Sequence, residues 1–501
     1  MGTVIQLDNV LIEGGTVYPF EEIAALFTPL IGKEVTLGHL MAITNRITKR
    51  YQDDGYALSY AVIPAQDLNY GQVRLILVEG YIADHEMRGD VGPVEDHIGK
   101  LAAKLINERP LRKESFERYT TLMAQIPGVT LRANVPAPTT TDGAVTLVTE
   151  AVRKPFAMSA NLSHSNRDDA KVLLAATSNS HTAVGEQVTL STLLPPGDDD
   201  ERYARIDYSQ FIGDEGTRLN GYVSAYRSDP DKIYPVGVAN TEMSRKNDRF
   251  SIGIAHPFKA SPSETLTGGA RIYAVNDERD FTRLTPLPVV PDAIKVKSKV
   301  RALALEGEWK IAEQNQLRIA SGGLYQGLDA LGAESDVKVL NESSGRFHDL
   351  DFLRLRLSGV QTNVFDDNWQ SVLSGAFYWS EDTLPTSEQV LFGDRNFGRG
   401  YPAEQAYGDK GWGLGYELGY SLHPGQSWLR LIQPYAAADA ARTWFNDDGI
   451  DSQLSSYALG MRFSDRRYYN LALEVSRPMG DKVIDSADRD PRFSFSLSYN
   501  L

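Results

Sequence analysis

The side chains that most often carry out chemistry are scarce in this chain and stand far apart. Cysteine is absent from the 501 residues, which excludes disulfides, thiolate metal sites and a cysteine nucleophile. The 8 histidines are scattered, and no two of them have the spacing of a metal-binding pair. No serine lies in the strand–turn–helix motif of hydrolases. The sequence therefore predicts a protein that is not an enzyme and that uses no cofactor or metal.

Two acidic runs, residues 198–200 and 447–448, are the remaining candidates for a cation site. Carboxylate oxygens are ligands that Ca²⁺ prefers, but short acidic runs are more typical of solvated loops, so we expect no metal ion there. Lys and Arg number 51, Asp and Glu number 66, and the net charge is -15. This acidic balance argues against nucleic acid as a partner.

The first 153 residues alternate between helical and extended patterns. Residues 4–10 form a strand pattern, and Pro19 begins a helix, a position that proline favours because its missing N–H would be unpaired there. A second helix is predicted for residues 37–51, where apolar side chains recur every three or four residues. Strands are predicted at 58–63 and 73–78. Together these segments make up one small α+β module.

The same order of elements then follows a second time. A short strand around Met87, two helices and two strands are predicted, the last four in residues 98–105, 116–126, 129–135 and 145–152. Residues 71–75 and 143–147 occupy matching places in the two modules. The pattern indicates a tandem β-α-α-β-β repeat of roughly 75 residues. A single α+β domain with chance internal similarity is the alternative.

From residue 156 onward the apolar residues recur with a period of two. In the clearest segment Leu353, Leu355 and Leu357 alternate with Arg354 and Arg356. One face of this strand must be strongly wet while the other is all leucine, which is the inside-polar, outside-apolar pattern of a transmembrane β-barrel. No run of the chain approaches the roughly 18 apolar residues of a transmembrane helix.

The connectors between these strands alternate in length. Long ones are expected at 195–201, 228–247 and 277–298, and short ones at 212–216 and 423–427. Long loops on one side and short turns on the other are typical of outer-membrane barrels. The remaining length accommodates about 16 strands. The predicted fold is therefore two α+β modules followed by an all-β transmembrane antiparallel barrel in a bacterial outer membrane.

The chain ends on a strand with one unbroken apolar face. Its members are Phe493, Phe495, Leu497, Tyr499 and Leu501. We expect this strand to close the barrel and to be the segment that the barrel-assembly machinery recognises during biogenesis. An apolar strand paired inside a soluble β-sandwich is the alternative.

The chain resembles the two-partner secretion transporters (TpsB), the haemolysin and filamentous-haemagglutinin exporters of the Omp85 superfamily. The tandem repeat looks like two POTRA domains, and residues 73–80 are typical of the end of the first. The most specific match is Phe397-Gly398-Arg399-Gly400-Tyr401, which resembles the tip of the long loop that folds back into the barrel in this superfamily. Residues 407–422 and 434–442 also resemble family segments, so the resemblance covers almost the whole chain.

This resemblance implies an inward-folded lid loop at about residues 381–411, whose Arg399 pairs with Asp439 on an inward-facing strand. A carboxylate accepts two N–H groups of an arginine at once, which suits such a pair. Gly398 and Gly400 are expected to give the backbone a tight turn with positive φ, and Tyr401 is expected to pack against the barrel wall. An ordinary surface hairpin is the alternative.

The sequence departs from the family pattern in three places. Family members usually carry a plug helix and a linker before the first POTRA domain, and the strand pattern from residue 4 leaves no room for either; they are either removed from this chain or lacking, which puts plug-based gating in question. The last residue is Leu501 where the family usually has Phe. Residues 440–442 read Ala-Ala-Arg where Ala-Gly-Arg is more usual.

The resemblance implies POTRA domains at 1–81 and 82–153 in the periplasm and a barrel at 154–501. It also implies an outer-membrane translocator that recognises a large exoprotein of adhesin, haemolysin or toxin type through its N-terminal secretion domain and passes it through the barrel pore. Outer-membrane lipids are the other expected partners, and the protein is expected to be a monomer. The alternatives are a barrel-assembly insertase of the same superfamily and a passive porin, although porins lack such a repeat.

Client binding by strand addition requires an exposed edge or groove on the modules. Two candidate contact surfaces follow from the pattern. One is the edge at 58–63, with Leu58, Tyr60 and Val62, and the other is the helix face that holds Leu122 and Met123.

Overall fold

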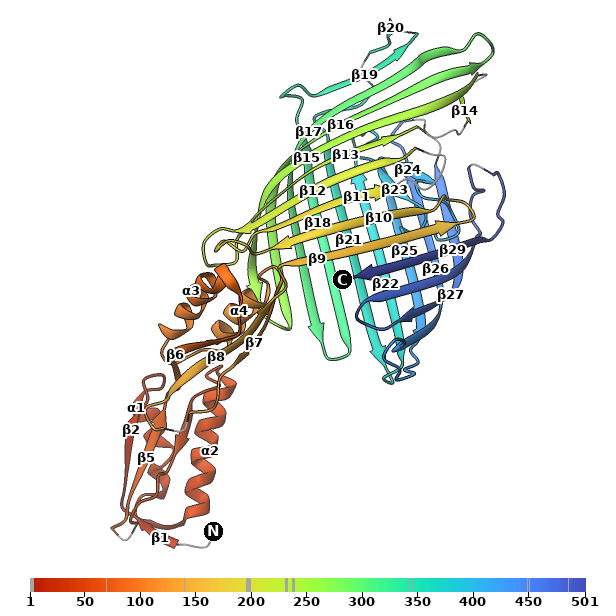
Figure 1. The fold of residues 1–501 in the computed structure, drawn as a ribbon. Coiled ribbons are helices and arrows are strands. Elements are labelled where there is room, and N and C mark those ends of the chain that lie inside the picture. Colours follow the sequence, from red (N-terminus) through yellow and green to blue (C-terminus); the bar gives the residue numbers. More distant parts are fainter. Residues whose placement is uncertain are drawn as a thin grey trace. The chain divides into compact units, whose positions relative to one another are not determined.

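A computed structural model describes most of the chain (Figure 1). The described residues are 4–68, 70–138, 140–194, 200–229, 233–236, 239–340, 342–345, 347–447, 449, 451–484 and 486–501. Asp198 and Asp199 of the first acidic run and Asp448 of the second lie outside them. The chain divides into two compact units, one made mainly of residues 1–154 and one made mainly of residues 155–501.

The first module of the N-terminal unit has a three-stranded sheet with strand order β2-β5-β4, in which β2 runs parallel and β4 antiparallel to β5. Its elements are β1 (Val4–Leu7), β2 (Asn9–Gly14), α1 (Phe20–Ala25), η1 (Thr28–Leu30), β3 (Lys33–Thr36), α2 (Leu37–Asp53), β4 (Tyr60–Val62) and β5 (Gln72–Val78). The Thr36 hydroxyl accepts a hydrogen bond from the His39 backbone N–H at 3.2 Å, which caps the start of α2.

Two boundaries of this module differ from the sequence prediction. The single strand expected at 4–10 is two strands, because the backbone N–H groups of Asp8 and Asn9 donate to the Gly71 carbonyl and the chain changes partner there, from β3 to β5. The first helix ends at Ala25 and is followed by a short 3-10 turn. Pro29 has no backbone N–H and cannot donate to the Ala25 carbonyl as an α-helix requires, which accounts for this break.

The second module repeats the topology of the first. Its elements are β6 (Tyr81–Arg88), η2 (Gly92–Val94), α3 (Glu95–Ile106), α4 (Lys113–Ala124), β7 (Val129–Asn134) and β8 (Ala144–Arg153). The strand order is β6-β8-β7, again with one parallel and one antiparallel pairing. Among the residues that the structure describes, no helix combines the length and apolarity needed to cross a membrane.

The face of α4 proposed for client contact is not available in this structure. Leu122 is 1% exposed and Met123 is 0% exposed, so both belong to the core of the second module. The helical spacing that marked them as an apolar face is the spacing of a core face. The interpretation of Leu122 and Met123 as a contact surface was therefore wrong.

The second unit is a closed antiparallel barrel with 16 membrane-crossing strands, as predicted (Figure 1). In the described ranges these strands are β9 (Phe156–Ser165), β10 (Lys171–Asn179), β11 (Gln187–Leu194), β12 (Arg202–Phe211), β13 (Arg218–Ser228), β15 (Ala239–Ala260), β16 (Glu264–Thr285), β17 (Val290–Glu313), β18 (Gln316–Gly327), β21 (Leu353–Phe365), β22 (Trp369–Ser380), β25 (Lys410–Tyr420), β26 (Leu431–Trp444), β27 (Ser452–Ser464), β28 (Tyr469–Pro478) and β29 (Arg492–Asn500).

The last strand, β29, closes the ring by pairing with both β28 and β9. Closure leaves no open sheet edge, which is the condition for a sheet to cross a lipid bilayer. Phe493, Tyr499 and Leu501 on the predicted apolar face are 60%, 42% and 56% exposed. Such exposure of large apolar side chains is expected where the outer surface of a barrel meets lipid.

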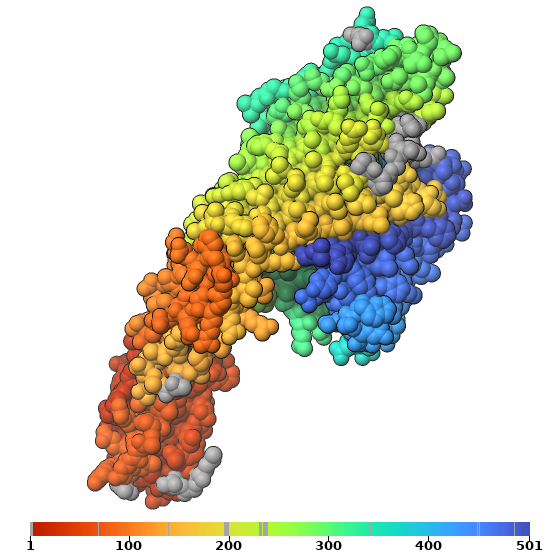
Figure 2. Space-filling view, in the orientation of Figure 1, coloured from red at the N-terminus to blue at the C-terminus, as the bar shows by residue number. Residues whose placement is uncertain are grey.

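The long connectors predicted at 228–247 and 277–298 are largely strands instead. β15, β16 and β17 have 22, 22 and 24 residues and stay paired far beyond the length that spans a bilayer. The short strand β14 (Ile233–Val236) pairs with β15 and β19 (Glu334–Val339) pairs with β17, while β20 (Glu342–Ser343) pairs with β19. In Figure 2 this extension, coloured mainly green, makes up the upper end of the barrel unit.

Cross-strand ion pairs support the extension. Lys295 Nζ lies 2.5 Å from Glu278 Oε1 and 3.1 Å from Asp280 Oδ1, and Arg245 Nε lies 3.0 Å from Asp277 Oδ1. Outside the hydrocarbon both faces of a strand meet water, so the apolar–polar alternation disappears. Because this alternation is missing, the sequence predicts loops where the structure has strands.

The Glu79 carboxylate, at the end of β5, joins three segments of the first module by hydrogen bonds. The Glu79 carboxylate accepts hydrogen bonds from the backbone N–H of Thr16 (2.7 Å) and Val17 (2.9 Å), the Thr16 hydroxyl (2.7 Å) and the Tyr51 hydroxyl (3.0 Å). Burial by itself raises the pKa of Glu79, but these hydrogen bonds outweigh burial and hold the pKa below its usual value.

We expect Glu79→Gln to lower the free energy of unfolding of the first module by about 1–2 kcal/mol, because the neutral amide cannot accept all four bonds. A group with a lowered folded pKa stabilises above its unfolded pKa, and this contribution is lost as pH falls through the folded value, so variant and wild type converge once the pH lies below the lowered pKa of Glu79. Amide hydrogen exchange of residues 72–78 in the full chain measures the effect. The exposed Glu21→Gln is the control, and equal protection in Glu79→Gln and wild type contradicts the prediction.

Candidate functional site

The connection between β22 and β25 is a long loop whose two limbs pair with each other. We call residues 381–409 the lid loop. It contains the short antiparallel strands β23 (Val390–Phe392) and β24 (Ala406–Gly408). Its tip, residues 393–401, is pinned by isolated bridges from Gly393 to Asn396 and from Asp394 to Gly398.

Apolar contacts hold the lid loop against inward-facing residues of the barrel. Val390, Phe392, Tyr401 and Ala406 cluster with Ala441, Leu454 and Val483. Ala441 lies on the buried face of β26, whereas its neighbours on the other face, Ala440 and Arg442, are half-buried and exposed. A loop that covers this buried face lies inside the barrel.

Arg399, at the tip of the lid loop, reaches carboxylates on two strands of the wall. Its Nη1 lies 2.6 Å from Glu474 Oε2 on β28, and its Nη2 lies 2.9 Å from Glu417 Oε2 on β25. Charge-assisted bonds of this length are the strong class of hydrogen bond. Removing one partner of such a buried pair costs about 3–5 kcal/mol, because the other charge is left uncompensated.

Asp439, the partner expected from the resemblance, is the most distant of the three carboxylates. Its Oδ2 lies 3.9 Å from Arg399 Nε and accepts a 3.4 Å hydrogen bond from the Arg399 backbone N–H. Its Oδ1 accepts a 2.7 Å hydrogen bond from the Ser456 hydroxyl. The structure thus brings Arg399 and Asp439 together but gives Arg399 shorter contacts with Glu417 and Glu474.

A second arginine completes this cluster. Arg462 on β27 binds Glu417 with both terminal nitrogens, at 2.5 and 2.9 Å, and the Tyr435 hydroxyl donates to Glu474 Oε2 at 2.8 Å. The guanidinium carbon of Arg462 lies 4.0 Å from the centre of the Tyr435 ring. We call Arg399, Glu417, Asp439, Arg462 and Glu474 the tip cluster.

The sequence contained a signal for these missed partners. Glu417 is the one charged residue on the face of β25 that otherwise carries Gly413, Gly415 and Gly419. A single carboxylate on a glycine face is a polar group that requires a partner. The glycines also make room for the lid loop, since a Cβ on Gly413 would lie 2.4 Å from the Phe397 ring.

The glycines beside Arg399 act through close approach and not through positive φ, which corrects the sequence interpretation. The positive φ angles at the tip belong to Gly393 (139°), Asp394 (51°) and Phe397 (57°). A Cβ on Gly400 would lie 2.5 Å from the Pro478 backbone nitrogen, and one on Gly398 would lie 2.9 Å from the Gly393 Cα. Only glycine lets the tip lie this close to the wall.

Tyr401 and the Arg399 backbone fix the tip to the last strands of the barrel. Tyr401 is 0% exposed, and its hydroxyl donates to the Asp481 carbonyl at 2.9 Å. The Arg399 carbonyl accepts from the Ser476 hydroxyl at 2.7 Å and from Arg492 Nη1 at 3.2 Å. The predicted packing of Tyr401 on the wall is therefore present in the geometry.

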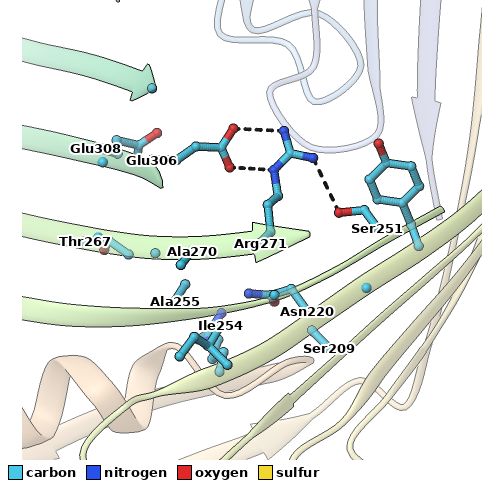
Figure 3. A pocket seen from close by; sticks show the side chains of 18 of the residues that line it. Ser209, Asn220, Ser251, Ile254, Ala255, Thr267, Ala270, Arg271, Glu306 and Glu308 are labelled. Atoms are coloured by element: carbon cyan, nitrogen blue, oxygen red, sulfur yellow. Dashed lines mark hydrogen bonds and ion pairs between the residues drawn. The ribbon is translucent and has the colours of Figure 1, made fainter. Parts of the chain in front are cut away.

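Beside the lid loop the barrel encloses a polar cavity of about 770 Å³, which we call the vestibule (Figure 3). Its wall comes from β11, β12, β13, β15, β16, β17, β18 and β21. Much of the lining is glycine and small polar residues, including Ser209, Asn220 and Ser251. Figure 3 shows Arg271 with two bonds to Glu306, at 2.8 and 2.9 Å, and one to Ser251. Paired charges and small side chains give a wide, polar surface without one dominant sign.

Two family models match the chain. The model described as "POTRA domain, ShlB-type" matches residues 5–80, and the model described as "Haemolysin secretion/activation protein ShlB/FhaC/HecB" matches residues 303–463. The heme/hemopexin transporter protein HuxB of Haemophilus influenzae is 22% identical over 483 residues, which cover 94% of this chain and 82% of that relative.

Solved structures show the same fold. CdiB from Escherichia coli has a TM-score of 0.75 at 16% identity and covers 100% of this chain and 91% of its own. CdiB from Acinetobacter baumannii has a TM-score of 0.64 at 14% identity, with the same two coverages. BamA from Haemophilus ducreyi lacking POTRA domains 1-3 has a TM-score of 0.52 at 12% identity and covers 100% of both chains.

The barrel and the modules before it define an outer-membrane β-barrel protein with periplasmic POTRA domains. The two family models narrow this class to secretion channels, which are not enzymes. These matches are to the two-partner secretion transporters, the TpsB family of the Omp85 superfamily, which the chain resembles from its first module to its barrel. Transporters of this family work with a secreted exoprotein partner.

The geometry at Gly400 gives a direct prediction. Gly400→Ala places a methyl group against the backbone of Pro478, and overpacking of this kind costs about 1–3 kcal/mol, so we expect the folded barrel to convert to its unfolded gel mobility at a lower temperature. Gly307→Ala is the matched control, since its nearest neighbour would be 3.7 Å away. Equal conversion temperatures for Gly400→Ala and wild type would place the tip away from the wall.

Proposed function

We propose that this chain recognises one large exoprotein through residues 1–153 and passes it in extended form through the barrel at 154–501. The proposed POTRA boundaries are 1–81 and 82–153. The observation that carries the proposal is the polar vestibule inside the barrel, beside a lid loop whose tip Arg399 holds to the wall. This arrangement offers a passing chain a polar surface inside the barrel while the wall keeps its shape.

The vestibule suits a polypeptide more than a small, strongly charged solute. An unfolded chain offers amide groups and mixed side chains, and these are compatible with a surface of glycines, hydroxyls and paired charges. Arg205 binds Asp207 with bonds of 2.8 and 2.5 Å, as Arg271 binds Glu306. Charges already paired attract neither sign strongly, so they do not hold a passing chain.

The cargo we propose is an exoprotein of adhesin, haemolysin or toxin type. The relative HuxB is named a heme/hemopexin transporter, so an exoprotein concerned with heme or hemopexin is a second candidate. We further propose that the transporter acts as a monomer and that the face of Phe493, Phe495, Leu497, Tyr499 and Leu501 is read by the barrel-assembly machinery.

For client binding we propose the groove between α2 and the β4 edge of the first module. It has a volume of about 310 Å³, and its lining includes Met41, Asn45 and Val62. β4 pairs with β5 on one side only among the described residues. A strand laid in this groove gains main-chain hydrogen bonds from the edge and apolar contact from the helix.

The edge is guarded in the free protein. The Thr48 hydroxyl binds both the N–H (3.0 Å) and the carbonyl (3.4 Å) of Ala61, and the Gln66 amide binds the N–H (2.7 Å) and carbonyl (2.9 Å) of Arg74. Side chains that occupy an edge prevent unspecific strand pairing. A client must therefore displace Thr48 or add beyond Val62, which favours a specific partner.

We expect Arg399→Ala to reduce secretion of the exoprotein at least about tenfold while the barrel still assembles, since Glu474 and Glu417 lose the charge that draws the tip to the wall. Asp439→Ala is expected to have a smaller effect because its contact with Arg399 is longer. Secreted exoprotein is compared with barrel level in the outer membrane. Arg395→Ala, an exposed arginine of the same tip, is the control, and undiminished secretion by Arg399→Ala would remove the support for this function.

We expect Asn45→Trp to weaken binding of the exoprotein's N-terminal secretion domain to the full transporter at least about tenfold, because the indole fills the groove from the exposed face of α2. Arg46→Trp adds the same bulk one residue along, outside the lining, and is expected to bind as wild type does. Affinity is measured with the purified domain in detergent. Equal weakening by both variants, or by neither, contradicts a client site in this groove.

A further inference from the structure

The lid loop is held at a second place, far from the tip cluster. Its first limb carries Glu388, which is 2% exposed. The carboxylate accepts a 2.8 Å hydrogen bond from the Tyr273 hydroxyl on β16 and lies 3.1 Å from Arg354 Nη2 on β21. Arg354 Nη1 also donates to the Glu388 backbone carbonyl at 2.6 Å.

An apolar contact accompanies this ion pair. Leu384 of the lid loop is fully buried in a cluster with residues of β16, β17 and β18 and with Phe352 beside β21. We call Glu388, Arg354 and Tyr273 the latch. In the ring of 16 strands, seven strands lie between β16 and β28 in each direction. The bonds Tyr273–Glu388 and Arg399–Glu474 therefore attach the lid loop at opposite points of the barrel, and the loop crosses the lumen between them.

The two attachments differ in how well their polar groups are satisfied. Around the latch, Arg354 Nε, Ser387 Oγ and Gln389 Oε1 are buried and find no hydrogen-bond partner among the described residues. A buried polar atom without a partner costs about 1–3 kcal/mol relative to its solvated state. The tip cluster has no such atom among its described residues, and three carboxylates and the buried Tyr401 hold it. The latch is the attachment that opens at lower cost.

The latch also borders the vestibule. Tyr325 lines the vestibule, and the guanidinium carbon of Arg354 lies 4.3 Å from the centre of its ring. Arg271, which lines the same cavity, lies 5.0 Å from the ring of Tyr273. The Tyr325 hydroxyl donates to Glu306 Oε1 at 2.7 Å. Groups that contact a chain in the vestibule thus touch both latch residues of the wall.

We propose that Glu388, Arg354 and Tyr273 form the releasable attachment of the lid loop, and that the first limb swings away from the β16–β21 wall to let the exoprotein continue past the vestibule. The tip cluster stays closed and acts as the fixed point of this motion. The inference rests on the proposed function and deepens it by naming the residues that gate the path.

The test measures gating without any exoprotein. Full-length wild type and Glu388→Gln are reconstituted in planar lipid bilayers, and the frequency of high-conductance openings is recorded. Glu388→Gln keeps the shape of the side chain but removes the charge that holds Arg354, so we expect openings to be at least about tenfold more frequent. Tyr273→Phe removes one hydrogen bond and is expected to give about a threefold rise.

The matched control is Glu381→Gln. Glu381 belongs to the same loop and pairs with Lys410 at 3.2 Å, but its side chain is 67% exposed, so we expect openings as in wild type. Heat-modifiable gel mobility shows whether each barrel is folded, and Tyr273→Phe carries the test if Glu388→Gln does not fold. Unchanged openings in the folded latch variants, or an equal rise in Glu381→Gln, would overturn the proposal.

Secretion assays on the same variants separate the latch from the proposed function. More frequent openings together with no secretion by the wild-type chain would leave the latch standing and remove the translocator function. Unchanged openings with normal secretion by wild type would remove the latch alone.

Discussion

The arrangement of the barrel interior depends on one constraint, which is that the charge of Arg399 must be neutralised away from bulk water. A guanidinium on a loop inside a barrel has little solvent around it, and an unpaired buried charge is far more costly than a paired one. Glu417 and Glu474, from strands separated by two others in the ring, meet this requirement at 2.9 and 2.6 Å. Their positions draw the tip of the lid loop to one side of the lumen, and the vestibule lies along β11 to β21 on the other side.

The wall is shaped to receive this loop. Gly413 accommodates the Phe397 ring, and Gly400 brings the loop backbone against Pro478. Because each of these glycines has no side chain, its backbone comes directly against the ring or the backbone of the other segment. Polar groups that come this close need partners, and Ser476, Arg492 and Asp481 supply them to the tip. The fixed end of the loop is therefore specified by steric fit and charge together.

The two units solve the problem of open strand edges in different ways. The barrel removes its edges by closure between β29 and β9, as lipid requires. The first module keeps an edge on β4 but covers it with the Thr48 hydroxyl, while Gln66 covers the next open groups at Arg74. Side chains that cover an edge in this way prevent unspecific strand pairing, and a client strand can still displace them. The need to satisfy backbone hydrogen bonds is thus met by fixed strand pairing in the barrel and by exchangeable side-chain contacts at the β4 edge.

The sequence by itself determined the elements that depend on local periodicity. The period of two at 353–358 predicted a barrel strand, the repeated helix–strand order predicted tandem modules of one topology, and the apolar face from Phe493 predicted the closing strand. The sequence prediction failed where the local pattern does not tell what a residue contacts in the folded protein. The long strands β15, β16 and β17 lose their alternation outside the bilayer, and Leu122 and Met123 have the same spacing whether a helix face meets a client or a core. Arg399 was marked by the residues around it, but its nearest carboxylates stand 18 and 75 positions away in sequence. Only barrel closure and strand register bring Glu417, Glu474 and the latch residues to the loop, because a distance across the lumen is set by the tertiary structure.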